Sequence, residues 1–146
     1  MATVTQVVGA RTALNITLAS LANGSYATSD AFNATVDDPL DVLVEVTVTP
    51  GATTGNQQAV VFAVASLDNS NYQTGPVTAD EAVLNFVGVL PLITDSTIQR
   101  KIFSVAAAFG GVLPSYFKII VKNDTGAAFA ASGHSLFTAT VIGNVA

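Results

Sequence analysis

The chain has 146 residues, of which 50% are apolar and only 10% are charged, with a net charge of −5 and no cysteine. This length suits one domain with a well-filled core, and the apolar content excludes intrinsic disorder. The lack of cysteine excludes disulfides, thiolate chemistry and zinc–cysteine sites, and so few charges predict that neighbouring chains cover part of the surface.

Residues 1–11 alternate weakly between polar and apolar side chains, and no turn folds them back on a neighbouring strand. We predict here an N-terminal arm that pairs with another chain, the alternative being a frayed terminus. The domain itself is expected over residues 12–146. Asn15 and Thr17 interrupt the apolar stretch 13–22, which therefore indicates a strand and not a targeting segment.

A side-chain period of two dominates the rest of the chain. In residues 41–49, DVLVEVTVT, a valine stands at every second position, which is typical of a half-buried strand. Turn-forming Asn, Asp, Gly and Pro separate the runs, so we predict an all-β fold: an antiparallel β-sandwich or jelly roll of about eight strands in a single domain. The other runs cover residues 12–18, 26–32, 59–66, 82–90, 97–105, 116–122 and 135–142.

Two short segments permit helix. One helical turn is expected at residues 78–82, where Asp80 and Glu81 stand near its start. Residues 127–131 are rich in alanine but offer Phe129 as their only large side chain.

The charges divide unevenly along the chain. Nine of the ten carboxylates precede residue 96, and four of the five basic residues follow it. This division predicts an acidic face and a weakly basic face that steer association, the alternative being chance scatter. A few separated cations on an acidic chain form no basic stripe, which argues against a nucleic-acid partner. Our candidate interaction residues are the five basic ones: Arg11, Arg100, Lys101, Lys118 and Lys122.

Two of these lysines belong to one predicted strand, residues 116–122. Lys118 and Lys122 are expected on its outer face, while Phe117, Ile119 and Val121 point to the core. The lysines then form a thin basic rim that prevents wrong edge pairing or meets an acidic neighbour.

No residue pattern predicts reaction chemistry. The single histidine, His134, stands between a glycine and a strand, where a turn residue is expected and not a catalytic base. Asp37, Asp38 and Asp41, and likewise loop 67–76, lack the ligand spacing of an EF-hand, so turn capping is preferred over calcium binding. No phosphate-binding loop is present, and no apolar run approaches the roughly 20 residues of a membrane helix. We therefore expect no enzyme, cofactor, metal or membrane partner.

Residues 97–146 combine a Leu-Pro-Ser-Tyr step, the strand FKIIVKNDTG, the small-residue segment AAFAASGHS and a last strand close to the C-terminus. This combination resembles small virion proteins of tailed bacteriophages, of the capsid decoration (cement) or head-fibre type. The resemblance implies a protein made in the host cytoplasm and placed on the capsid surface. With the low charge and the arm, it predicts a decoration protein that binds the major capsid protein and copies of itself, with a trimer expected, and stabilises the shell.

Other functions stay open at this point. A head-fibre or tail-associated virion subunit would show the same features. A carbohydrate-binding sandwich usually stacks sugars on aromatic faces, and this chain has no tryptophan and three tyrosines: Tyr26, Tyr72 and Tyr116. Exposed tyrosines lined up on one sheet face would support a sugar site, and an enzyme would need His134 and a carboxylate in one pocket.

Overall fold

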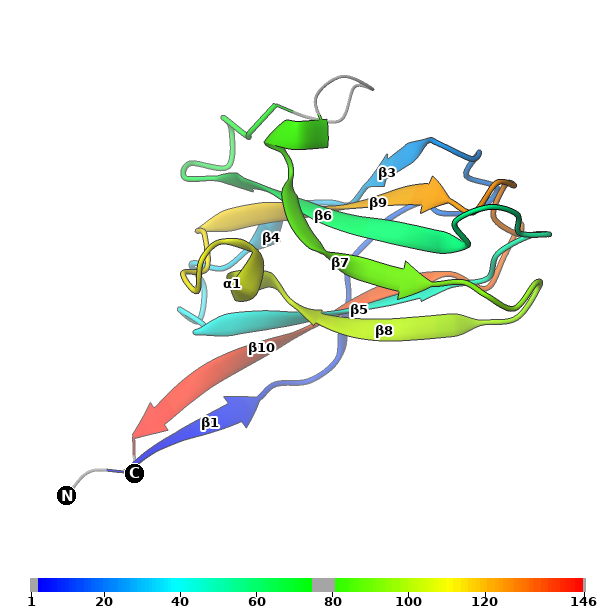
Figure 1. Cartoon of the computed structure of the whole chain (residues 1–146). Helices are drawn as coiled ribbons and strands as arrows, with labels where there is room; N and C mark the ends of the chain where they lie inside the picture. Colours follow the sequence, from blue (N-terminus) through cyan, green and yellow to red (C-terminus); the bar gives the residue numbers. More distant parts are fainter. Residues whose placement is uncertain (1–2, 75–80, 146) are drawn as a thin grey trace.

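This computed structural model describes residues 3–74 and 81–145 of the chain. The described residues form two antiparallel sheets with ten strands in total (Figure 1). The prediction of an all-β sandwich is confirmed. Sheet A has the order β1 (Val4–Val8), β10 (Ser135–Val145), β5 (Asp41–Val48) and β8 (Gln99–Ser104), and β2 (Thr12–Ala13) also pairs with β10. Sheet B has the order β3 (Tyr26–Thr28), β9 (Tyr116–Asp124), β6 (Gln58–Ser66) and β7 (Asn85–Pro91), and β4 (Phe32–Asn33) also pairs with β9.

The core lies between the inner faces of the two sheets. Every second residue of β5 is completely buried, as the alternation in the sequence predicts, and so are Phe117, Ile119 and Val121 of β9. Each such side chain contributes roughly 1.5–3 kcal/mol when it leaves water. Phe32 stacks on Phe117, with ring centroids 5.0 Å apart, and extends the core to the side of β4.

Residues 12–18 keep the predicted alternation but do not form the predicted strand beyond Ala13. The backbone N–H of Leu14 still donates to Leu136 (2.9 Å), after which the chain passes from sheet A to sheet B. Ile16 and Leu18 pack into the core from this crossing segment. The side-chain alternation at residues 12–18 therefore reflects burial of every second side chain and not pairing with a neighbouring strand.

The helical segments differ from the expectation. The predicted turn at 78–82 lies mostly outside the described residues, Glu81–Val83 form one 3₁₀ turn (η1), and residues 127–131 contain no helix. A short helix, α1 (Val105–Ala108), follows β8 where the sequence predicted strand up to residue 105.

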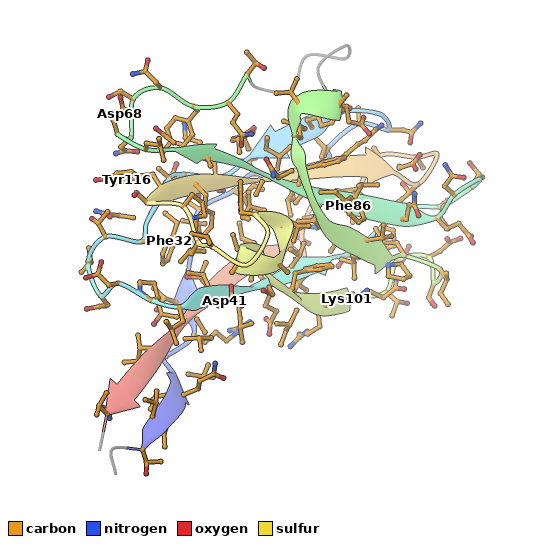
Figure 2. The ribbon with its side chains drawn as sticks, turned by 60° about the vertical axis from the view of Figure 1, so that its left-hand side comes forward. Phe32, Asp41, Asp68, Phe86, Lys101 and Tyr116 are labelled. Carbon is orange, nitrogen blue, oxygen red and sulfur yellow. The ribbon has the colours of Figure 1, made fainter. Side chains whose placement is uncertain are left out.

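Helix α1 is held by a carboxylate from a distant part of the chain. Asp41 Oδ1 accepts the N–H of Ala106 (2.9 Å), and Oδ2 accepts the hydroxyl of Ser104 (2.6 Å), whose own oxygen accepts the N–H of Ala107 (3.3 Å). Figure 2 shows Asp41 beside the helix. Two capping acceptors satisfy backbone donors that have no partner within the helix. Asp41 therefore caps a helix, whereas the sequence predicted that it caps a turn.

A buried amide organises the turn after β9. Asn123 is fully buried; its Nδ2 donates to Leu21 and Ala127 (2.8 Å each), and its Oδ1 accepts from the N–H and the hydroxyl of Thr125 (3.0 and 2.7 Å). Gly126 follows at φ +85°, and a Cβ there would lie 2.5 Å from the backbone oxygen of Thr54. Only glycine fits this close approach.

Replacing Asn123 by alanine is expected to destabilise the protein by about 3 kcal/mol, because a fully buried side chain loses four hydrogen bonds and the N–H of Thr125 is left without an acceptor. This corresponds to a fall of about 10 °C in Tm for a domain of this size. Thermal denaturation followed by circular dichroism measures it. Asn56→Ala is the control, because Asn56 is exposed and bonds to Asp124 at the surface. Equal effects of both variants would contradict the role of the buried amide.

Candidate interaction surface

The backbone holds both ring nitrogens of His134. Nδ1 accepts the N–H of Thr49 (3.3 Å), and Nε2 donates to the carbonyl of Ala130 (2.7 Å). The ring lines an open depression of about 350 Å³ with Thr17 and Ser132, but no carboxylate in the described ranges 3–74 and 81–145 bonds to it. In this geometry the histidine orders the turn before β10.

The loop after β6 is likewise held by hydrogen bonds among its own residues. Asp68 Oδ1 accepts the N–H groups of Ser70 (2.9 Å) and Asn71 (2.8 Å), and Oδ2 accepts the amide of Asn71 (2.7 Å). These bonds, the one from Asn71 first, hold the pKa of Asp68 well below its usual range. The predicted Asx turn is confirmed for residues 67–74, and residues 75 and 76 lie outside the described part. Nowhere among the described residues do three or more His, Asp or Glu side chains gather as they would around a metal ion.

The five candidate basic residues do not gather on one face. Arg11 and Arg100 lie on the outer face of sheet A, and Lys118 and Lys122 on the outer face of sheet B. Lys101 lies at the edge of sheet A, where Nζ donates to the Val89 carbonyl of β7 (3.1 Å). The predicted basic face is therefore wrong, because pairing sends residues that are close in sequence to opposite sides of the sandwich.

The predicted edge role of the two lysines of β9 is also wrong. Strand β9 lies inside sheet B, between β6 and the short strands β3 and β4, so its lysines border no open edge. The Nζ of Lys118 lies 4.3 Å from the ring centroid of Tyr72, and the Nζ of Lys122 forms an ion pair with Glu81 (2.7 Å).

All three tyrosines lie on this outer face of sheet B, and Figure 2 shows Tyr116 near the end that carries Asp68. The rings of Tyr26 and Tyr72 pack on a second apolar cluster, and a lysine ammonium lies over each ring. The hydroxyl of Tyr26 donates to Glu81 and that of Tyr72 to Asn69. Two of the three rings are thus occupied by the protein itself and present no free stacking platform. The cluster consists of Phe62, Val64, Leu84 and Ile120.

The outer face of sheet A is different, because apolar side chains line it and no described segment covers it. Register places Phe137 of β10, Glu45 of β5 and Ile102 of β8 on one rung, with Leu43 on the next. Ile102 is 59% exposed. With Val8 of β1 these side chains line a shallow groove of about 230 Å³.

One charged pair lies inside this groove. The guanidinium of Arg11 lies 3.4 Å above the ring centroid of Phe137, and its Nη2 and Nε bond to Oε1 of Glu45 (2.6 and 3.2 Å). Half of the arginine side chain, 51%, stays exposed. Arg11 is the predicted interaction residue that the structure places at the centre of an apolar surface.

The apolar surface continues onto a two-stranded ribbon. Strand β1, from the predicted arm, pairs with the far end of β10, and the two project beyond the sandwich (Figure 1). By register Val4, Val8 and Val145 share the face of Phe137, and they are 66%, 58% and 67% exposed. We call this surface the outer apolar face, defined by Val4, Val8, Leu43, Ile102, Phe137 and Val145.

This surface was not predicted from the sequence. An apolar side chain that points outward is signalled by polar or charged residues two positions away on the same strand, as at Ile102 beside Arg100.

No family model matches the chain, and a search of curated proteins finds none that is significantly similar in sequence. No helix within residues 3–74 and 81–145 has the length and apolarity to cross a membrane.

On the outer face of sheet B, Lys122 and Tyr26 both donate hydrogen bonds to Glu81, and we call these three residues the clamp. The hydrogen bond from Lys122, with one from Tyr26, holds the pKa of Glu81 below its ordinary value, and the same bond to Glu81 raises the pKa of Lys122. Burial, followed by the bond to Glu81, raises the pKa of Tyr26. The clamp therefore ties η1 to the outer face of sheet B.

Glu81→Gln removes the ion pair and is expected to lower the free energy of unfolding at pH 7 by about 0.5 kcal/mol, since the pair is partly exposed. A lowered Glu81 pKa means that this stabilisation exists above pH 4.5 and disappears as the pH falls through the folded-state pKa. A raised Lys122 pKa means that it exists below pH 10.5 and disappears as the pH rises further. Urea denaturation at pH 3 and pH 7 measures the difference, with Asp37→Asn as an exposed control. If Glu81→Gln lowers the free energy of unfolding by the same amount at pH 3 and at pH 7, the clamp is refuted.

Proposed function

We propose that this protein is a structural subunit that binds other chains through the outer apolar face, and that it decorates the outside of a tailed-phage head. The observation that carries the proposal is that face itself. Four of its six side chains are more than half exposed, namely Val4, Val8, Ile102 and Val145, and the other two, Leu43 and Phe137, are half-buried. No described segment of the chain lies above them.

The energetics favour covering this face. Each Å² of apolar surface removed from water contributes roughly 25 cal/mol, and contiguous exposed apolar patches mark interaction sites on soluble proteins. Arg11, stacked on Phe137 and still half exposed, supplies an arginine and an aromatic ring together at the centre. Both residue types are enriched where binding energy concentrates.

The identity of the partner rests on the resemblance of residues 97–146 to phage decoration and head-fibre proteins. A decoration subunit has to present a rigid scaffold with a binding face, and a sandwich with a fully buried core supplies one. The proposed partners are the major capsid protein and further copies of this chain, and the proposed location is the capsid surface of the virion. Binding that bridges capsid subunits stabilises the shell by mass action.

Two alternatives use other observations. A head-fibre or tail-associated subunit would bind through the same outer apolar face, at a different place on the virion. A carbohydrate-binding module would use the tyrosines of sheet B, which lie on one face as such a module needs. We favour the outer apolar face of sheet A, because Tyr26 and Tyr72 on sheet B already contact Lys122 and Lys118.

Ile102→Glu tests the proposal, because it places a charge in the outer apolar face without touching the core. Heads of the phage that encodes the chain, prepared without this protein, are mixed with labelled wild type or variant, and binding is measured by co-sedimentation. We expect the wild type to bind and the variant to bind at least about tenfold more weakly, the effect of one charge buried without a partner.

The control is Val112→Glu, a position that is 75% exposed in the loop after α1. It should bind as the wild type does and keep the wild-type Tm. Ile102→Glu places a carboxylate opposite Glu45, so its Tm is expected to fall by up to about 3 °C, and binding is compared at a temperature where both variants are folded. Absence of wild-type binding to heads would overturn the virion assignment, and full binding by the Ile102 variant would remove the outer apolar face from it.

A further inference from the structure

Strand β1 is the outermost strand of sheet A, and its outer edge faces away from the sandwich (Figure 1). The register runs from Val4 opposite Val145 to Val8 opposite Val141, and all five residues of β1 are exposed. A strand edge of this kind presents unpaired backbone N–H and C=O groups to any strand that can approach.

The backbone groups that point outward can be assigned. The N–H of Gly9 donates to Thr140 (2.8 Å), so Gly9 faces β10. Residues of an antiparallel strand alternate in the side to which both of their backbone groups point. Thr5 and Val7 therefore face β10 as Gly9 does, and Val4, Gln6 and Val8 direct their N–H and C=O groups to the open edge.

Strand β1 carries none of the features that block edge pairing. Its sequence, VTQVV, has no charge and no proline. The opposite edge of the same sheet is protected: β8 carries Arg100 and Lys101, and the Lys101 ammonium reaches across to β7. Lysines and other charges at an edge are the usual protection against pairing. Of these two edges of sheet A, only β1 is built to accept another strand.

We propose that the partner of this edge is a second copy of the chain: two β1 strands pair antiparallel across a two-fold axis, with Gln6 opposite Gln6 of the partner subunit. The proposal rests on the proposed function in that both treat the chain as an assembly subunit, and it names the first contact of that assembly. Sheet A then runs without interruption through both copies.

The register follows from the composition of the strand. With the axis at Gln6, all five residues overlap, and Val4 lies opposite Val8 of the partner subunit on the outer apolar face. Such a pair of β-branched side chains stabilises a sheet, whereas like charges placed opposite each other destabilise it. Identical chains with a net charge of −5 repel one another, and a neutral strand is where two copies meet without adding to that repulsion.

A two-fold contact also differs from the trimer expected from the sequence. Antiparallel pairing of identical edges uses the same surface on both copies and closes after two. A trimeric mass in solution is therefore an outcome that counts against this proposal.

Cysteine cross-linking reads the register directly, because the chain has no cysteine of its own. In Gln6→Cys the two Cα atoms would lie about 5.5 Å apart, within the range that a disulfide spans. In the control Thr5→Cys they would lie about 8 Å apart, beyond that range. Under mild oxidation we expect covalent dimer from the first variant and at least about fivefold less from the second, judged on a non-reducing gel. Equal cross-linking of both variants overturns the register.

Gln6→Pro tests the pairing without cross-linking. Because the Gln6 N–H points to the open edge, proline removes a donor to the partner and leaves the bonds between β1 and β10 in place. Light scattering over a concentration series should give about twice the chain mass of 14.9 kDa for the wild type and the mass of one chain for the variant. A monomeric wild type, a trimer, or a Gln6→Pro variant that stays dimeric would each overturn the proposal.

These outcomes separate the two proposals. A monomeric wild type that still binds phage heads through Ile102 refutes the strand pairing and keeps the proposed function. A dimer that depends on Gln6 and does not bind heads keeps the strand pairing and refutes the virion assignment.

Discussion

The two sheets pack their apolar inner faces on each other, and this packing forms the core of the molecule. Each face is built around a strand with neighbours on both sides, β5 in sheet A and β9 in sheet B, and their inward residues are completely removed from water. Because only the inner faces form this core, the outer faces of the two sheets can differ in which segments cover them. Sheet B is covered by the 67–74 loop and η1, whereas sheet A stays open.

Polar side chains hold the connections of this sandwich in place. Asp41 caps α1, Asn123 closes the turn after β9, and both nitrogens of His134 bond to the backbone. Buried polar groups need such partners, because an unpaired one loses its bonds to water without replacement. Residues whose types suggest catalysis or metal binding are thus engaged in structure here.

Sheet A carries both of the surfaces that we propose for contacts. Its outer face is apolar around the pair of Arg11 and Glu45, and its β1 edge offers backbone groups without charge. A face and an edge of one sheet point in perpendicular directions. In the proposed assembly, the subunit pairs with its own copy along the edge and still presents the face to a different protein.

We could predict from the sequence the all-β class, the inward positions of strands such as 41–49 and 116–122, and the Asx turn at Asp68, because side-chain alternation and turn chemistry are local properties. Which strands are central and which are edges depends on how the strands assemble into sheets. This assembly placed Lys118 and Lys122 within a sheet, left the strand predicted at 12–18 without a partner after Ala13, and brought Asp41 to α1. It also turned Ile102 and Phe137 outward together. These features depend on which distant segments become neighbours, and alternation along one strand carries no information about the strand beside it.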